Sequence, residues 1–336
     1  MPDAGIDRSR LTFHLLPLPK GVKGTRAAGF LGDEPAGTYA KSTNKTFLCT
    51  TRVTIALGTG ESGAPVGPEA VYAATLWTGK KNTPQAVAWT IRGKEAIGSA
   101  LPAPGFGSSH ATAVAGLDVV GTGEPTGDGP SRALLWKAGA APVVLANPGD
   151  PAASTAAHAV AGDLQGGSSG GMAAGACIWQ GSTESFVALH PKDVDASCVR
   201  AVSDTEQAGD FEPTVDTGAQ KRAGLWRGRA DTLVDLTPDG AANAAATACA
   251  AGFQAGWIEE TPRSQRFRAW LWAGSAAESM DLHSLVGGDW TASTIRCAQV
   301  QGDRLLLLGT VERRQESGGY KMLIAEQACW WEYALR

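Results

Sequence analysis

A short motif that ends in tryptophan recurs through this chain and constrains its fold more than any other feature. Small or apolar residues precede the tryptophan in QAVAW (Trp89), RALLW (Trp136), GACIW (Trp179), RAGLW (Trp226), RAWLW (Trp272) and QACWW (Trp331). Successive tryptophans are between 43 and 59 residues apart. A period of this length is typical of arrays built from one repeated supersecondary unit.

Each repeat contains four short apolar segments. A segment that usually ends in proline follows the tryptophan, as at Pro102, Pro148, Pro191 and Pro238. An alanine- and valine-rich segment such as TAVAG or HAVAG comes next, then a segment such as VVG, and then the next tryptophan motif. Gly, Pro and Asp turns separate the segments, which predicts four short strands. Four strands per repeat predict a blade, and a ring of such blades is a β-propeller.

The two ends of the chain complement each other. Only EYALR follows Trp331, so the last repeat has no fourth segment downstream. Near the N-terminus, LTFHLLP (residues 11–17) matches LVDLTP, the fourth segment that ends at Pro238. We therefore predict that the N-terminal strand completes the last blade, a Velcro closure that leaves no open seam in the ring.

The predicted fold class is all-β: one domain, 1–336, that forms a seven-bladed β-propeller of four-stranded antiparallel blades. Six blades are the alternative, because the first repeat carries Cys49 where others carry tryptophan and residues 61–84 are compressed. The predicted boundaries are 11–17 for the outer strand of the last blade, then 25–57, 58–102, 103–148, 149–191, 192–238, 239–284 and 285–336 for blades one to seven.

One pair of segments carries a family resemblance. Asp118-Val119-Val120-Gly121, followed by the RALLW motif of Trp136, resembles bacterial repeat propellers of the HAF-repeat kind. The resemblance implies a propeller fold and an origin by repeat duplication, and it implies no activity and no functional residue. The sequence has no Gly-His or Trp-Asp pairs as in WD40 repeats, and no double-glycine signature that recurs from repeat to repeat as in kelch repeats.

Composition excludes several classes of function. The net charge is −4 with both signs interspersed, which argues against a nucleic-acid partner. No apolar run reaches the roughly 18 residues of a membrane span, and the first ten residues lack an apolar signal core, so we expect a soluble cytoplasmic protein. The six cysteines never form a C-x-x-C pair, so we expect buried thiols in a reducing compartment and neither a metal site nor a cofactor.

Motifs of known catalytic chemistry are also missing. The sequence contains no P-loop and no H-E-x-x-H. The glycine-rich run 166–171 matches G-x-S-x-G in letters, but it lies between two predicted strands with no helix to follow, so we expect a flexible turn there and no nucleophile elbow. It leaves open whether the chain is an enzyme, favours that it is not, and identifies no catalytic residue. His110 and His158 precede or begin innermost segments of adjacent blades, so we expect both at the channel mouth. The acids Asp33, Asp118, Asp163 and Asp204 recur in turns, as tight-turn residues or as a ring that holds a cation.

Loop variation suggests a function. Loops on one face of a propeller differ most between repeats, and variable loops on a rigid scaffold are where binding usually resides. Trp290 lies off the repeat pattern, near loops rich in arginine, although a solvated and charge-balanced rim is a competing interpretation. We therefore expect a non-enzymatic binding or scaffold propeller that recognises a protein partner, with a carbohydrate-binding propeller and then a channel-mouth enzyme as alternatives. The predicted partner-binding residues are Trp290, Arg263, Arg266, Arg313, Arg314 and Tyr320.

Overall fold

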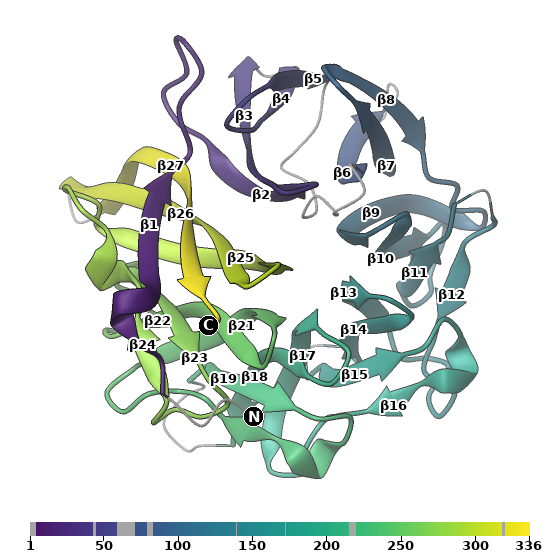
Figure 1. The fold of residues 1–336 in the computed structure, drawn as a ribbon. Coiled ribbons are helices and arrows are strands. Elements are labelled where there is room, and N and C mark those ends of the chain that lie inside the picture. Colours follow the sequence, from purple (N-terminus) through teal and green to yellow (C-terminus); the bar gives the residue numbers. More distant parts are fainter. Residues whose placement is uncertain are drawn as a thin grey trace.

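Seven antiparallel sheets surround a central axis, as expected for a seven-bladed propeller (Figure 1). The structure is a computed structural model that describes residues 5–42, 45–58, 71–78, 83–138, 140–171, 173–214, 220–317 and 320–336. Six sheets have four strands each, and the second blade is described as three. The alternative of six blades is therefore wrong.

The strands follow one another outward from the axis in each blade. In the second blade the tryptophan motif of Trp89 lies on β7 (Thr83–Arg92), so the three described strands correspond to the second, third and fourth strands of the other blades. Blades one to four are β2 (Arg26–Leu31), β3 (Glu34–Ser42), β4 (Lys45–Cys49), β5 (Thr54–Gly58); β6 (Val71–Thr78), β7 (Thr83–Arg92), β8 (Glu95–Ala100); β9 (Phe106–Ala115), β10 (Asp118–Pro125), β11 (Arg132–Trp136), β12 (Val143–Leu145); and β13 (Thr155–Ala161), β14 (Leu164–Ser169), β15 (Gly175–Trp179), β16 (Val187–Ala188). Blades five to seven are β17 (Val194–Val202), β18 (Gln207–Pro213), β19 (Arg222–Trp226), β20 (Val234–Asp235); β21 (Asn243–Ala250), β22 (Phe253–Glu259), β23 (Phe267–Trp272), β24 (Ser279–Asp281); and β25 (Ala292–Gln301), β26 (Arg304–Ser317), β27 (Tyr320–Ala334) with β1 (Leu11–Leu15). Short 3₁₀ turns at Arg8–Arg10, Thr183–Ser185, Ala230–Thr232 and His283–Leu285 complete the described elements. None of the helices in the described part of the chain is long and apolar enough to cross a membrane.

The N-terminal strand closes the ring as the sequence predicts. β1 pairs antiparallel with β27, from Leu11 opposite Tyr333 to Leu15 opposite Cys329. In Figure 1 the purple β1 lies beside the yellow C-terminal strands. The rings of Phe13 and Trp331 pack at a centroid distance of 5.2 Å, so the closure also buries apolar surface.

The repeated tryptophans lie in the core between blades. Trp136, Trp179, Trp226, Trp272 and Trp331 are at most 2% exposed, and each such ring buries about 150–250 Å². Three of them also donate the indole N–H to a backbone carbonyl at the end of the preceding blade. Trp136 donates to Pro102 at 2.7 Å, Trp179 to Ala146 at 2.9 Å and Trp331 to Leu282 at 3.1 Å. The motif therefore joins neighbouring blades as well as filling the space between them.

Buried hydroxyl groups make a second repeated link between blades. A Ser or Thr near the start of an innermost strand accepts a hydrogen bond from a backbone N–H in the third strand of the blade before it. The pairs run from Ala86 to Ser109, Ala133 to Thr155, Ala176 to Ser197, Ala269 to Ser293 and Ala328 to Thr25, at 2.8 to 3.0 Å. These links fix the innermost strands, which line the axis.

Candidate functional site

A β-bulge recurs at one position of the innermost strands. In β17, Val199 pairs with Gly209 and Ala201 pairs with Ala208, so Arg200 between them has no partner in the ladder. The same register shift occurs in each of the six described innermost strands. The register skips one residue in each of these strands, namely Ala28, Thr112, His158, Arg200, Thr247 and Arg296. A bulge re-aims a side chain relative to the regular pleat, and we call these six residues the bulge ring.

A glycine on the neighbouring strand makes the bulge sterically feasible. A Cβ atom on Gly167 would lie 1.9 Å from the backbone oxygen of Ala156, and one on Gly209 would lie 1.9 Å from that of Cys198. The equivalent glycines of the third, sixth and seventh blades, Gly121, Gly256 and Gly309, show distances of 1.8 to 2.0 Å. The glycine of the VVG-type segment is thus required by the close approach of the bulged strand.

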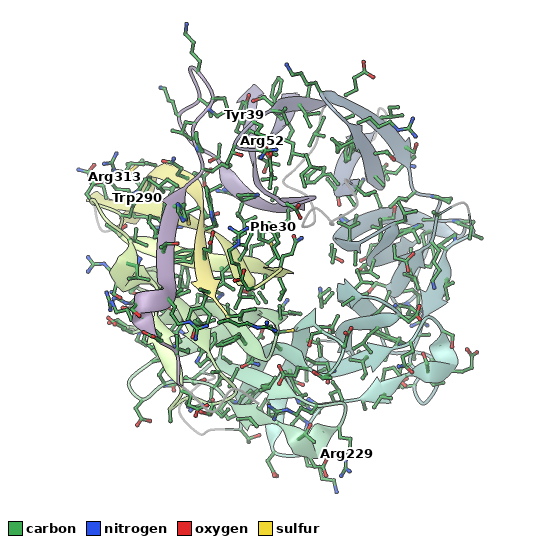
Figure 2. The ribbon with its side chains drawn as sticks, viewed as in Figure 1. Phe30, Tyr39, Arg52, Arg229, Trp290 and Arg313 are labelled. Carbon is green, nitrogen blue, oxygen red and sulfur yellow. The ribbon has the colours of Figure 1, made fainter. Side chains whose placement is uncertain are left out.

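The bulge ring lies where two halves of an axial channel meet. His158, Arg200, Thr247 and Arg296 line both a cavity of about 400 Å³ and a second cavity of about 550 Å³. These volumes are in the range of small-ligand pockets. In Figure 2 the ring of Phe30, which lines the first cavity, lies near the centre of the propeller.

The two halves of the channel differ in chemistry. The first cavity, which we call the apolar half, is lined largely by the Ala and Val residues that follow the bulge in each strand, such as Ala113–Ala115 and Ala159–Ala161. The second cavity, the polar half, is lined by Arg26, Thr294, Trp257 and Glu312 among others. A ligand along the axis would therefore pass from apolar to polar surroundings at the bulge ring.

The charge at the ring is predominantly positive. Arg200 Nε donates to Asp210 Oδ1 at 2.7 Å, while Lys221 Nζ lies 3.1 Å from Asp210 Oδ2. Asp210 is 5% exposed, so two cations share one buried carboxylate. The ring itself contributes two guanidinium groups, one imidazole, two hydroxyls and no carboxylate.

His158 is the titratable member of the ring. Burial and, after it, the nearby Arg200 cation lower the pKa of its imidazole to about 4, while Asp210 opposes the shift. Its Nε2 lies 3.5 Å from Ser168 Oγ. The imidazole is therefore neutral at pH 7 and offers a hydrogen bond without adding charge.

The two threonines of the ring hold adjacent strands together. Thr112 Oγ1 donates to the carbonyl of Ala157 at 2.5 Å, and Thr247 Oγ1 donates to the carbonyl of Ile295 at 2.6 Å. Each bond crosses from one innermost strand to the next blade. These contacts keep the channel wall at the ring from spreading.

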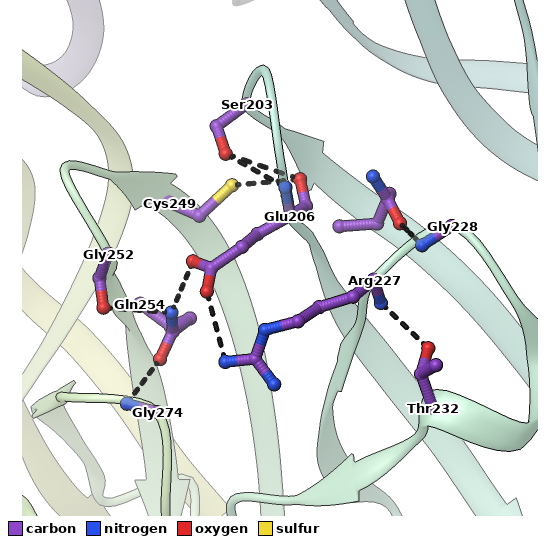
Figure 3. Close-up of polar contacts among 10 residues, drawn as sticks. Ser203, Glu206, Arg227, Gly228, Thr232, Cys249, Gly252, Gln254 and Gly274 are labelled. Atoms are coloured by element: carbon purple, nitrogen blue, oxygen red, sulfur yellow. Dashed lines mark hydrogen bonds and ion pairs between the residues drawn. The ribbon is translucent and has the colours of Figure 1, made fainter. Parts of the chain in front are cut away.

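A buried polar network fixes one part of the apolar mouth (Figure 3). Glu206, 7% exposed, follows the turn residues Ser203 and Asp204 that line the channel. Its carboxylate accepts from Arg227 Nη2 at 3.1 Å and from Gln254 Nε2 in the next blade at 2.8 Å. A buried and satisfied network of this kind makes the wall between the fifth and sixth blades rigid.

The structure separates the two histidines expected at the channel mouth. His158 belongs to the bulge ring, at mid-depth rather than at the mouth. His110 does not line either of the two channel cavities. The other four ring residues with polar side chains were not identified from the sequence, although they occupy one position of the repeated TAVAG-type segment.

The recurring turn acids do not form a metal site. In the described part of the chain no three His, Cys, Asp or Glu side chains are placed to hold a metal ion. Asp118 and Asp163 instead share the ammonium group of Lys137, whose Nζ lies 3.9 Å from Asp118 and 3.8 Å from Asp163.

The residues expected to bind a protein partner lie on adjoining loops, and several of them make contacts within the chain. Trp290 is half-buried against the core of the sixth and seventh blades, and Arg313 pairs with Asp289. Arg314 bonds to Glu312 Oε2 at 2.8 Å through Nε. Figure 2 shows Trp290 and Arg313 at the periphery, away from Phe30 at the centre.

The remaining three residues of that set differ from one another. Arg263 and Arg266 are exposed in the loop between β22 and β23. Tyr320 is the first residue of β27, and its side chain lies outside the described residues. The loop of Arg263 and Arg266 lies beside Arg314, whose Nη1 donates to Gln265 Oε1 at 2.7 Å. Much of the charge of these loops is therefore paired within the chain.

Comparison with known proteins locates the fold. No protein-family model matches the chain, and no curated protein matches it. Among solved structures, the β-propeller domain of the Trilobed protease from Pyrococcus furiosus has a TM-score of 0.57 at 9% identity, over 93% of this chain and 98% of that one. That domain is described as having an open velcro topology, whereas β1 and β27 are paired here.

Two larger peptidases are also similar. Prolyl oligopeptidase B from Galerina marginata, solved with a 35mer substrate, has a TM-score of 0.55 at 10% identity, over 95% of this chain. Pyrococcus horikoshii acylaminoacyl peptidase has a TM-score of 0.52 at 11% identity, over 92% of this chain. The chain spans 51% and 57% of these two proteins, respectively. At such identities the likeness establishes the propeller fold.

These neighbours correct the function expected from the sequence. They are propellers of peptidases, so the interpretation as a non-enzymatic scaffold that recognises a protein partner through variable loops, with a carbohydrate-binding propeller as its alternative, is wrong. The physical reason lies in the loops, whose charges are largely paired within the chain and whose tryptophan packs on the core. The distinctive chemistry is at the axis instead.

Proposed function

We propose that this chain is a propeller of a peptidase-like protein and that its axial channel binds extended peptides. The observation that carries the proposal is the channel itself, with polar side chains re-aimed into it by the same bulge in blade after blade. Bulges are concentrated next to functional sites, where they direct a side chain. The two cavities along the axis, of about 400 and 550 Å³, have room for an extended peptide but not for a folded domain.

The peptidase neighbours support the class of ligand. One of them was solved with a 35mer peptide substrate. We further propose that the chain is not itself hydrolytic and that the groups that cleave the peptide belong to another domain or polypeptide. The structure supports this division, because the G-x-S-x-G match at residues 166–171 lies on and just after β14, and the next described element is strand β15 rather than the helix of a nucleophile elbow.

Two finer expectations from the sequence belong to this proposal. The HAF-type resemblance of the third blade supports an origin by repeat duplication within bacterial propellers. Free cysteines, five of them buried, support a reducing compartment such as the cytoplasm. A peptide ligand is proposed in preference to nucleic acid, in keeping with the net charge of −4.

Filling the channel tests the proposal. Ala161 and Ala250 are half-buried and line the apolar half, so Ala161→Trp with Ala250→Trp narrows it. Leu117→Trp, at a turn position that is 52% exposed, is the matched control. Binding of short, unstructured, fluorescently labelled peptides is measured by anisotropy, and melting temperatures confirm that each variant folds.

We expect the parent and the control to bind the peptides alike, and the filled variant to bind at least roughly ten-fold more weakly, a loss of about 1.4 kcal/mol. Mass spectrometry should find the peptides intact after incubation with the purified chain. Undiminished binding by a folded, filled variant would exclude the channel as the site. Cleavage by the purified chain would refute the proposal that the cleaving groups belong to another domain or polypeptide.

A further inference from the structure

The bulge ring suggests which part of a peptide the channel recognises. Its side chains include two arginines, one on β17 and one on β25, with the strand of Thr247 between them. Both arginines line both halves of the channel. Guanidinium groups bind carboxylates with paired, charge-assisted hydrogen bonds, and they do so best where water is largely displaced.

The charged groups around the ring favour an anion. Asp210 is shared between Arg200 and Lys221, so one positive charge exceeds the local carboxylate. Glu312, in the polar half, is held by Arg314 at 2.7 Å, and Asp204 is exposed at the other mouth. Neither acid belongs to the bulge ring, and none of the six described residues of the ring carries a carboxylate.

The chemistry on either side of the ring gives the ligand a direction. The apolar half offers alanine and valine side chains from several blades, with few polar groups. A peptide that entered there with its C-terminus leading would leave its last side chains against this apolar wall. Its terminal carboxylate would then reach the arginines at the ring.

We infer that the bulge ring is a carboxylate site in which Arg200 and Arg296 hold the free C-terminus of a peptide whose last side chains are small and apolar. The inference rests on the proposed peptide-binding function and specifies its ligand. Thr112 and Thr247 are positioning residues, because their hydroxyls hold the neighbouring strands at the ring. His158 contributes a neutral hydrogen-bonding group at the same level.

The test compares two forms of one ligand. A fluorescently labelled peptide of alanine and valine is prepared as the free acid and as the C-terminal amide, and both are titrated with the intact chain. The variants are Arg296→Gln and the double change Arg200→Gln with Asp210→Asn, which avoids leaving the buried Asp210 carboxylate without Arg200. Arg222→Gln, on β19 and paired with Asp235, is the control.

We expect the free acid to bind at least ten-fold more tightly than the amide, and each ring variant to remove that preference by weakening binding of the free acid far more than binding of the amide. The control should keep the preference. Equal binding of acid and amide by the parent overturns the inference and leaves the proposed function standing, whereas failure of both forms to bind overturns both. Competition by butyrate at the peptide's own concentration would make a free small acid the ligand and overturn the inference.

Discussion

Replacing Gly167 by alanine tests the architecture on which the channel depends. Gly167 lies on β14 opposite the bulge at His158, and an added Cβ would be 1.9 Å from the carbonyl oxygen of Ala156. An ordinary carbon–oxygen contact is about 3.3 Å or more. The two strands would therefore have to separate by roughly 1.4 Å at a position where the obstacle is backbone and cannot rotate away.

The cost follows from the hydrogen bonds that such a separation breaks. Each backbone bond contributes about 0.5–1.5 kcal/mol net, and a buried group left unsatisfied costs about 1–3 kcal/mol. Loss of two ladder bonds beside the bulge gives a destabilisation of about 3–5 kcal/mol, within the range of severe core substitutions. With an unfolding entropy of about 2.1 cal/mol/K per residue, this corresponds to a melting temperature lower by about 4–7 °C for a chain of this length.

Two glycines of the same blade calibrate the measurement. Gly166→Ala meets methyl groups of Val199 and Val202 at 2.5 and 2.6 Å, which are side chains of the next blade, so we expect an overpacking cost of about 1–3 kcal/mol. Gly171→Ala meets nothing within 4 Å and should change stability by less than about 0.5 kcal/mol. Calorimetry or urea unfolding gives the order. A Gly167→Ala protein as stable as Gly171→Ala would refute the proposed bulge geometry.

Three further predictions concern closure, titration and thiol reactivity. Deleting residues 1–17 removes β1 and exposes the edge of β27, so we expect a lower melting temperature and self-association on size-exclusion chromatography; a stable monomer would contradict the role of the closure. The pKa of His158 is lowered from 6.5 to about 4, so between these pH values the unfolded state binds a proton that the folded state does not. The free energy of unfolding should therefore fall by up to about 3 kcal/mol as the pH drops from 6.5 to 4. In His158→Gln, the urea-unfolding midpoint should depend less on pH in that range. Burial raises the pKa of Cys49 and of Cys198 to about 11, so both should react with a thiol reagent at pH 8 only after unfolding, and rapid labelling of either in the native state would count against the packing.

The repeat made the fold predictable. Six of the seven repeats carry a tryptophan in their third strand, and a turn follows each short strand, which leaves few alternatives to a propeller. The match of residues 11–17 to the fourth segment identified the closure. The indole N–H bonds from Trp136 and Trp331 to the preceding blade were not predictable, because they depend on the distance between blades. Sequence periodicity describes each blade, whereas contacts between blades come from the twist and spacing of the sheets.

The channel site was harder to predict because its signal is a difference between repeats at a position that looks regular. In TAVAG, HAVAG and the equivalent segments of the later blades, the position of Thr112 and His158 is taken by Arg200, Thr247 and Arg296. If side chains simply alternate between the two faces of a strand, these residues look like ordinary members of a regular strand. Only the register shows that each lies at a bulge and belongs to a ring around the axis. Attention to variable loops instead favoured Trp290, which packs on the core.

The bulge places a position that must be glycine next to a position whose side chain can vary between blades. On β14 and β18 the position opposite the bulge must be glycine, because any side chain would meet the bulged backbone. The bulged residue has no partner in the ladder, so blade packing places little restriction on its side chain. Alanine, threonine, histidine and arginine all occur there among the described blades, beside a glycine that the fold requires. A position that varies freely next to one that cannot vary is where duplicated blades can acquire different chemistry without losing the ring. The axis, rather than the outer loops, is therefore where the physical constraints leave room for recognition.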